Sequence, residues 1–217
     1  NKDPVYEHTM LGKQMLLLGD FFGAWQLYDA MRALDYLASR SEVNPEKLAV
    51  TGCSGGGTMS SFLLAFDRRL TMGAPSCYMC SFEQNACNEL TSDSEQIIPR
   101  ALKLGIEEAD LIIAAAPRPV VLLAQDGDQF DLRGTKQAYE DIKKIYALLG
   151  APGAIQLHVG TGPHGYPPDH RDALLKFFAQ YTSPLQSGDP KRNLVKEYSE
   201  KETWATPAGS VLDLPGS

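Results

Sequence analysis

A serine in the run Gly52-Cys53-Ser54-Gly55-Gly56 has the sequence setting of a catalytic nucleophile. The run matches G-x-S-x-G and lies between a short apolar segment and a helix-type segment, the context in which such a turn exposes its serine. We expect Gly52 and Gly56 to leave room where the strained turn crosses itself. The Gly55 amide would then donate to an oxyanion. A turn that binds phosphate, or a turn without chemistry, is the alternative.

A serine hydroxyl needs a histidine base, which in turn needs a carboxylate that orients it. The carboxylate is expected after the apolar run 120–124, where three aspartates follow within a few residues. We favour Asp128, because it follows a glycine and lies far enough past the run to reach the edge of the sheet. Asp131 is the second candidate and Asp126 the third, and the unused aspartates would cap the next helix.

The sequence offers four histidines as the base. We favour His164, because its run GPHGY follows the last predicted strand and precedes the last predicted helix. His158 lies inside that strand and is expected to pack in the core, whereas His170 begins the helix and is expected to be solvated or capping. His8 has no expected partner. The favoured nucleophile, acid and base thus follow in that order at the ends of three successive strands.

Helix-type and strand-type segments alternate around these residues. Apolar residues at three- and four-residue steps predict helices over residues 19–40, 59–66, 135–149 and 171–181. Short apolar runs predict strands over residues 48–52, 120–124 and 155–159, in a sheet for which we expect four strands in all. This alternation predicts an α/β fold with a mostly parallel sheet and helices on both faces.

Residues 76–112 interrupt the alternation and are predicted to form an insertion or cap. The acids Glu107, Glu108 and Asp110 would line a substrate pocket there or lie on a solvated face. Three cysteines also occur in this segment, Cys77, Cys80 and Cys87. We favour free thiols over a disulfide, and since no fourth ligand for zinc lies near them, no metal or cofactor is predicted.

Composition limits the class of protein. A chain of 217 residues, 43% of them hydrophobic, is long enough for one core. Its net charge of -7 argues against nucleic-acid binding, and its apolar runs are shorter than the ~20 residues that span a bilayer. The opening run NKDP does not resemble a signal peptide. The compartment stays open, with a secreted or periplasmic location as a weak hypothesis.

Three stretches of the chain resemble the α/β-hydrolase superfamily: ALDYLASRSEVNPEKLAVTGCSGGGT (33–58), AAAPRPVVLLAQDGDQFD (114–131) and GPHGY (162–166). They are most similar to its acetyl xylan esterase-like and dienelactone hydrolase-like branch, near the prolyl-oligopeptidase catalytic domain. The resemblance implies Ser54 as nucleophile, His164 as base and Asp128 as acid, acting on carbohydrate esters such as acetylated xylan. The alternatives are a prolyl-oligopeptidase-type serine peptidase, and a non-catalytic half-domain that assembles with another chain.

The chain departs from this superfamily in what precedes the nucleophile. Its members typically have eight strands, some of which come earlier in the chain and carry the second oxyanion donor. We therefore expect residues 1–183 to be the C-terminal half of such a catalytic domain. The N-terminal half would be a second chain or a cleaved segment, and residues 184–217, rich in Ser, Pro, Gly, Lys and Glu, would be a tail or lead into a further domain.

Overall fold

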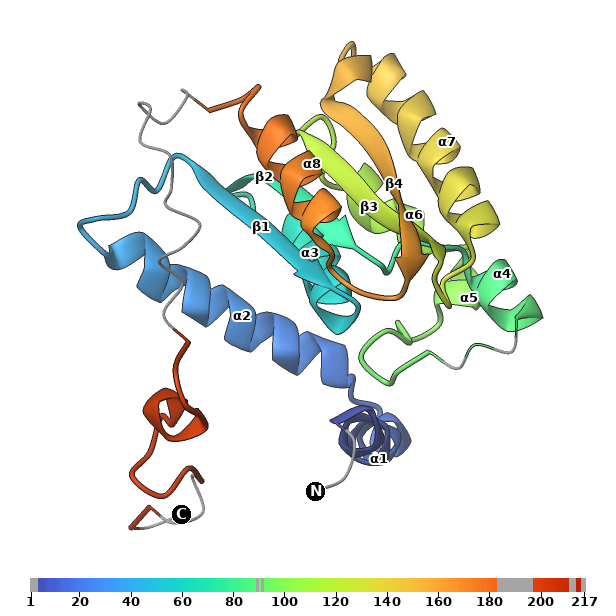
Figure 1. Ribbon diagram of the computed structural model, residues 1–217. Coiled ribbons are helices and arrows are strands. Elements are labelled where there is room, and N and C mark those ends of the chain that lie inside the picture. Colours follow the sequence, from blue (N-terminus) through green and yellow to red (C-terminus); the bar gives the residue numbers. More distant parts are fainter. Residues whose placement is uncertain (1–3, 89, 91, 183–196, 211–213, 216–217) are drawn as a thin grey trace. The chain divides into compact units, whose positions relative to one another are not determined.

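A parallel sheet of four strands lies at the centre of the chain's first unit, residues 1–182 (Figure 1). The strands pair in chain order: β1 (Leu48–Cys53), β2 (Leu70–Ser76), β3 (Val120–Gly127) and β4 (Ile155–Pro163). The computed structural model describes residues 4–88, 90, 92–182, 197–210 and 214–215. The second unit, residues 183–217, contains the 3-10 helix η3 (Glu200–Thr203). Residues 184–196 of the predicted tail lie outside the described residues.

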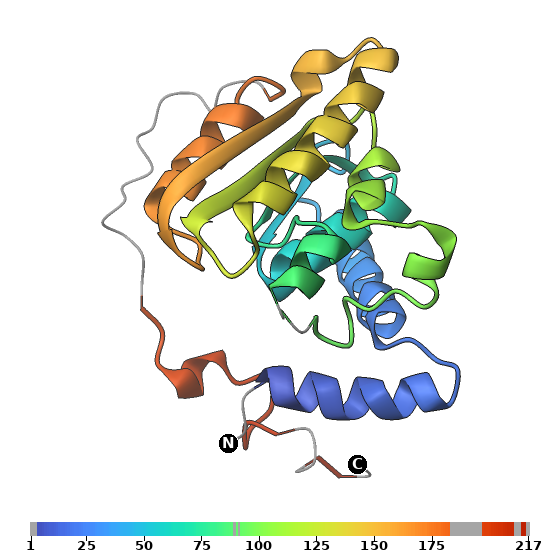
Figure 2. The ribbon, with the colours of Figure 1, turned by 90° about the vertical axis from the view of Figure 1, so that its right-hand side faces the viewer.

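Helices cover both faces of the sheet (Figures 1 and 2). On one face lies α8 (Pro168–Phe178), whose Phe177 packs against Val121 and Leu123 of β3. The opposite face carries α2 (Phe22–Ser39), α3 (Gly55–Phe66), α6 (Glu108–Ile113) and α7 (Leu132–Leu148). The remaining helices are α1 (Pro4–Leu17), α4 (Phe82–Cys87), α5 (Ala101–Leu104) and the 3-10 helix η1 (Pro152–Ala154). The predicted α/β fold is confirmed. No helix among the described residues is long and apolar enough to cross a membrane.

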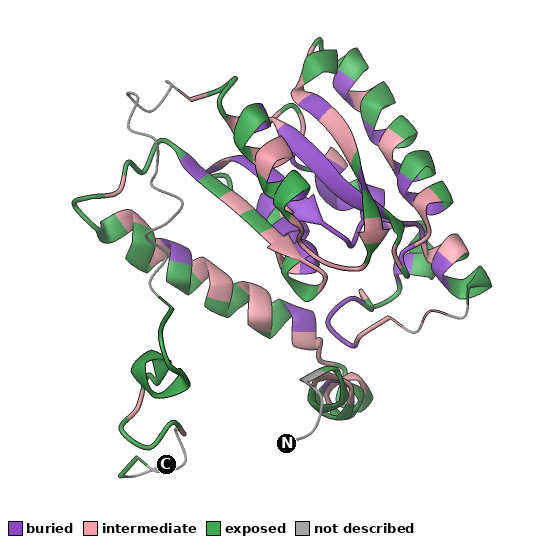
Figure 3. Cartoon of the chain, in the orientation of Figure 1, coloured by how far each residue is buried: buried purple, intermediate pink, exposed green. Residues whose placement is uncertain are grey.

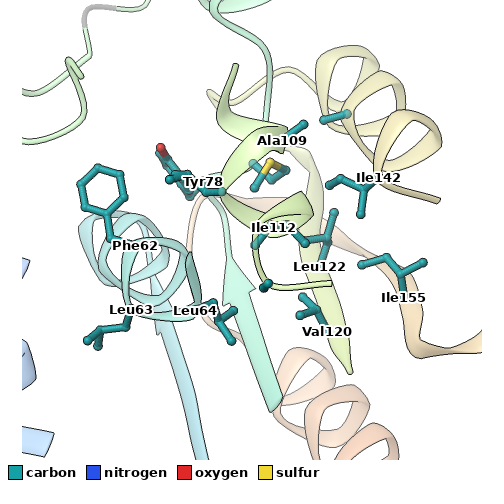
Figure 4. Packing of buried hydrophobic residues seen from close by; sticks show 14 of the residues in the cluster. Phe62, Leu63, Leu64, Tyr78, Ala109, Ile112, Val120, Leu122, Ile142 and Ile155 are labelled. Atoms are coloured by element: carbon teal, nitrogen blue, oxygen red, sulfur yellow. The ribbon is translucent and has the colours of Figure 1, made fainter. Parts of the chain in front are cut away.

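The larger part of the core lies between β3 and the helices α3, α6 and α7 (Figure 4). The first six residues of β3 are buried, and the strand is purple for most of its length in Figure 3. Leu64, Ile112 and Leu122 meet in this layer with at most 1% of each side chain exposed. Burial of each such side chain contributes roughly 1.5–3 kcal/mol, so the strand ends that carry the candidate site are held by rigid packing.

No range was predicted for strand β2, for the helices α1, α4, α5 and α6, or for the 3-10 helices η1 and η3. Strand β2 contains Gly73 and Pro75, which are typical of turns and obscure the strand pattern. Gly73 is required by packing, because a Cβ there would lie 2.4 Å from Leu64 Cδ1. Helix α1 precedes the predicted helix at 19–40, which begins at Phe22.

The segment after β2 is part of the core rather than a cap over it. Helix α6 lies against α3 and α7. Glu108 is 1% exposed, and its carboxylate accepts hydrogen bonds from the Cys80 amide (2.8 Å) and Asn85 Nδ2 (3.1 Å). Glu107 and Asp110 form a capping box at the start of α6. The expectation of a pocket lining or a solvated face was therefore wrong for Glu108, which holds the backbone of this segment.

Stability is expected to fall with rising pH because of Glu108. Burial, more than any other cause, raises the pKa of its carboxyl group from 4.5 to about 8. The folded state then binds a proton that the unfolded state has released, so the free energy of unfolding decreases between about pH 4.5 and 8. Urea midpoints across this range should decline for the native protein and stay flatter for Glu108→Gln. The exposed Glu83→Gln serves as the control, and an equally flat profile for native protein would contradict the prediction.

Candidate active site

Ser54 lies in a strained turn between β1 and α3. Its backbone angles are φ 60° and ψ −119°, a conformation that non-glycine residues rarely adopt and that is common at functional sites. The Ser54 amide donates to the Ser76 carbonyl oxygen at 3.0 Å, which ties the turn to the end of β2. The predicted strand–turn–helix setting is therefore present, and Gly55 begins α3, where backbone amides point out of the helix.

Two glycines make this turn sterically possible, and they differ partly from the predicted pair. A Cβ on Gly52 would lie 2.5 Å from the Gly56 carbonyl oxygen, and a Cβ on Gly57 would lie 2.4 Å from the Ser76 carbonyl oxygen. A Cβ on Gly56 would meet no atom within 4 Å. The crossing therefore needs Gly52 and Gly57, and the expectation that Gly56 provides room through its missing side chain was wrong.

Gly52→Ala is expected to destabilise the protein strongly. The new methyl group would overlap with the backbone of Gly56, which cannot rotate away as a flexible side chain could. Overpacking of this kind costs typically about 1–3 kcal/mol. Gly56→Ala is the matched control: it places the same methyl group in open space, and it should leave stability unchanged or raise it by up to about 1 kcal/mol. Urea unfolding of both variants measures the difference, and equal midpoints would contradict the prediction.

Asp128 and His164 form a hydrogen-bonded pair beyond the ends of β3 and β4. His164 Nδ1 donates to Asp128 Oδ1 at 2.8 Å, and the Phe130 amide donates to the same oxygen at 3.0 Å. The Asp128 side chain is 2% exposed and that of His164 is 29% exposed. A buried carboxylate on Nδ1 fixes the tautomer of the imidazole, so Nε2 is left as a proton acceptor.

The other two aspartates of this loop have structural partners instead. Asp126 accepts the Gly162 amide at 2.8 Å. Asp131 caps α7 by accepting the Arg133 amide at 2.7 Å. The Arg133 guanidinium, followed by Asn88, holds the pKa of Asp131 well below its usual range. Of the three candidates, Asp128 is the one that contacts His164.

Ser54 Oγ makes no hydrogen bond to His164 among the described residues. The structure thus brings Asp128 and His164 together and places Ser54 half-buried in its turn. The hydrogen bond between a nucleophile and its base is often long in unliganded enzymes and shortens when substrate binds. The arrangement therefore has the parts for nucleophilic attack.

His170 has a role that the sequence did not indicate. It is fully buried, its Nε2 lies 3.0 Å from the Ala124 carbonyl oxygen, and its Nδ1 lies 3.0 Å from Ser76 Oγ. A carbonyl oxygen can only accept a hydrogen bond, so Nε2 carries the hydrogen that points to Ala124. Nδ1 therefore has no hydrogen and accepts a hydrogen bond from the Ser76 hydroxyl. Burial lowers the pKa of His170 and keeps it neutral. The expected solvated or capping role was wrong: His170 joins α8 to β3 and to Ser76, the residue that holds the nucleophile's amide.

His8 also has a partner, and it lies beside a cavity. Its Nδ1 is 3.1 Å from Glu95 Oε1, which corrects the expectation of an unpaired histidine. Glu95 Oε1 lies 3.8 Å from where a Cβ of Gly55 would stand, close to the turn that carries Ser54. The cavity at this point has a volume of about 270 Å³, and it is lined by His8, Gln26, Asp29, Gly55, Met59 and Glu95. Four of these residues, His8, Gln26, Asp29 and Glu95, have side chains that can form hydrogen bonds.

All four cysteines, each of which the structure describes, are free thiols. Cys77 is buried beside the acid–base pair and donates to the Gly165 carbonyl oxygen. Burial raises the pKa of its thiol to about 12 and that of Cys80 to about 12. Thiols held in the protonated form are poor nucleophiles, so neither thiol is expected to act as one.

Comparisons with known proteins show a related family and a related fold. The Prolyl oligopeptidase family matches residues 20–81, which include the turn at Ser54. The structure of Methylesterase BT1017 superposes with a TM-score of 0.58 and 25% identity over 71% of this chain and 34% of that one. The chain has the α/β-hydrolase fold.

Two curated proteins with a related sequence are named for hydrolysis. YtaP of Bacillus subtilis (strain 168), named as a hydrolase, is 38% identical over 145 residues, or 64% of this chain and 47% of its own length. 4-O-methyl-glucuronoyl methylesterase 1 of Wolfiporia cocos (strain MD-104) is 24% identical over 220 residues, or 83% of this chain and 53% of its own length. The chain thus spans about half the length of the curated relatives that it matches.

Proposed function

We propose that the protein is a serine carboxylic-ester hydrolase in which Ser54, His164 and Asp128 are nucleophile, base and acid. The observation that carries the proposal is the partly buried 2.8 Å hydrogen bond between Asp128 and His164, on the same sheet edge as the strained Ser54 turn. His164 Nε2 takes the proton of the Ser54 hydroxyl as it attacks the ester carbonyl. Asp128 stabilises the imidazolium that forms.

The remaining steps follow from the same groups. The amide of Gly55, at the start of α3, donates to the oxyanion of the tetrahedral intermediate, aided by the positive end of the helix. His164 then gives its proton to the leaving alcohol and takes one from water, which releases the acid from Ser54. A second oxyanion donor would come from the part of the relatives' length that this chain does not span.

Carbohydrate esters are the proposed substrates. Relatives named as methylesterases support this class, and so does the cavity beside Gly55. Its lining offers carboxylates, an amide and an imidazole, groups that bind the hydroxyls of a neutral sugar. Acetylated xylan, expected from the sequence, and a methyl ester of glucuronic acid both present an uncharged ester carbonyl to Ser54.

A substrate panel tests the proposal in the intact native protein. Turnover of p-nitrophenyl acetate, acetylated xylan and methyl glucuronate would be compared with that of an aminoacyl p-nitroanilide. Ester turnover with no anilide turnover is the expected result. Anilide turnover would favour a serine peptidase, the second candidate, which the match to the Prolyl oligopeptidase family supports. No turnover of any substrate would favour the non-catalytic half-domain.

A further inference from the structure

His170 is a fully buried histidine that takes no part in the proposed proton transfers. It lies in the first turn of α8, the helix that covers one face of the sheet (Figure 1). Both of its ring nitrogens have partners on the strands, at 3.0 Å each. Burial of a polar ring costs free energy unless its hydrogen bonds are made, so the ring is fixed relative to β2 and β3.

One of these partners links His170 to the proposed nucleophile. The Ser76 hydroxyl, at the end of β2, donates to His170 Nδ1. The carbonyl oxygen of the same serine accepts the Ser54 amide at 3.0 Å. Ser76 is fully buried, and α3 packs tightly on it, since a Cβ on Gly57 would lie 2.4 Å from its carbonyl oxygen. A displacement of Ser76 is therefore passed on to the turn that carries Ser54.

The same ring supports the loop of the proposed base. Tyr166 follows His164 by two residues, and its ring meets that of His170 edge to face, with 6.0 Å between the centroids and 83° between the planes. The Thr51 hydroxyl of β1 donates to the Ala74 carbonyl oxygen. Thr51 Oγ1 therefore accepts a hydrogen bond from the Tyr166 hydroxyl, at 2.8 Å. The loop that carries His164 is thus held between His170 and β1.

The second nitrogen of His170 contacts the strand that leads to the proposed acid. Nε2 donates to the Ala124 carbonyl oxygen of β3, and this strand ends directly before Asp128. His170 therefore contacts all three segments that position Ser54, His164 and Asp128. The placement of these segments determines how closely the Ser54 hydroxyl and the His164 imidazole can approach each other.

We propose that His170 is a positioning residue for ester hydrolysis, and that it sets the separation of the Ser54 hydroxyl and the His164 imidazole through its hydrogen bond to Ser76. This inference rests on the proposed function. Attack of a hydroxyl group on an ester depends steeply on distance and direction, and a displacement of about 1 Å costs on the order of 10²-fold in rate. Loss of the contact with Ser76 should therefore lower kcat and leave substrate binding nearly intact.

Two substitutions separate the two hydrogen bonds of His170. In His170→Gln the side-chain amide reaches the place of Nε2 and can donate to Ala124, but Ser76 loses its acceptor. In His170→Asn the amide oxygen lies near the place of Nδ1 and accepts from Ser76, but Ala124 loses its donor. We expect His170→Gln to lower kcat for p-nitrophenyl acetate on the order of 10²-fold, with little change in KM. His170→Asn, the conservative variant, should keep kcat within a few-fold of native.

Each of these variants loses one buried hydrogen bond, so urea unfolding should show similar stabilities for the two. A merely structural role of His170 predicts equal losses of kcat, whereas the positioning role predicts unequal ones. Ser76→Ala should reproduce the fall in kcat of His170→Gln, and the double variant should fall no further, because both changes break the same contact. Circular dichroism establishes that each variant is folded.

Hydrogen exchange at the Ser54 amide gives a readout that does not need turnover. Ser76 holds that amide, so we expect faster exchange in His170→Gln and Ser76→Ala and near-native exchange in His170→Asn. If the native protein hydrolyses no ester, the proposed function fails, and the exchange rates alone decide whether His170 positions the turn. Equal kcat values in the two His170 variants, falls in kcat that multiply in the double variant, or unchanged Ser54 exchange in His170→Gln would overturn the proposal.

Discussion

Ser54→Ala is expected to lower kcat for p-nitrophenyl acetate on the order of 10⁶-fold, as loss of the nucleophile does in serine hydrolases. The reason is that no other described hydroxyl occupies the strained turn at the start of α3. The Ser54 side chain makes no hydrogen bond with other described residues, so its removal should leave the free energy of unfolding within about 0.5 kcal/mol of the native value.

Ser60→Ala is the matched control for this variant. Ser60 lies in the same helix and donates its hydroxyl to the Gly56 carbonyl oxygen, a bond that helix serines commonly make without chemistry. We expect the control to keep its activity within a few-fold of native. Steady-state kinetics and urea unfolding measure both variants, and activity retained in Ser54→Ala would remove this serine from the mechanism.

Asp128→Asn is expected to lower kcat on the order of 10⁴-fold. An asparagine at this position can turn its NH₂ group towards His164 Nδ1, which then accepts rather than donates. The proton moves to Nε2, and the imidazole can no longer take the proton of the Ser54 hydroxyl. The geometry of the pair is otherwise preserved, so KM should change much less than kcat.

Asp131→Asn tests whether Asp128, rather than Asp131 of the same loop, is the acid that orients His164. Asp131 caps α7 and pairs with Arg133, so we expect a loss of at most about 1 kcal/mol of stability and little change in kcat. The same kinetic assay on the two variants decides between the aspartates. A large fall in kcat for Asp131→Asn, with Asp128→Asn active, would reverse the assignment.

Local patterns predicted three of the four described strands, the helices α2, α3, α7 and α8, and the pairing of acid and base. The turn at Ser54 was recognisable because a tight strand-to-helix crossing needs small residues at fixed positions. His164 and Asp128 were found because the ends of parallel strands meet at one edge of a sheet. Each of these residues was recognised from its neighbours within a few positions, and the pairing of Asp128 with His164 followed from the fold class.

The features that sequence reasoning missed depend on contacts between distant residues. Strand β2 contains Gly73 because Leu64 of α3 packs against it, a constraint that a local pattern does not contain. Glu108 is buried because Cys80 and Asn85 donate to it from another segment. His170 has the same local appearance as a solvated residue at a helix start. Its partners come from β2 and β3, many residues earlier in the chain.

Labelling with a fluorophosphonate tests the central claim most directly. The reagent modifies a serine that an adjacent base activates, and the modified peptide is identified by mass spectrometry of the intact native protein and its digest. We predict a single adduct on Ser54 that is absent from Ser54→Ala and strongly reduced in Asp128→Asn. No adduct, or an adduct on another residue that persists in Ser54→Ala, would contradict the account of Ser54, His164 and Asp128 as a catalytic triad.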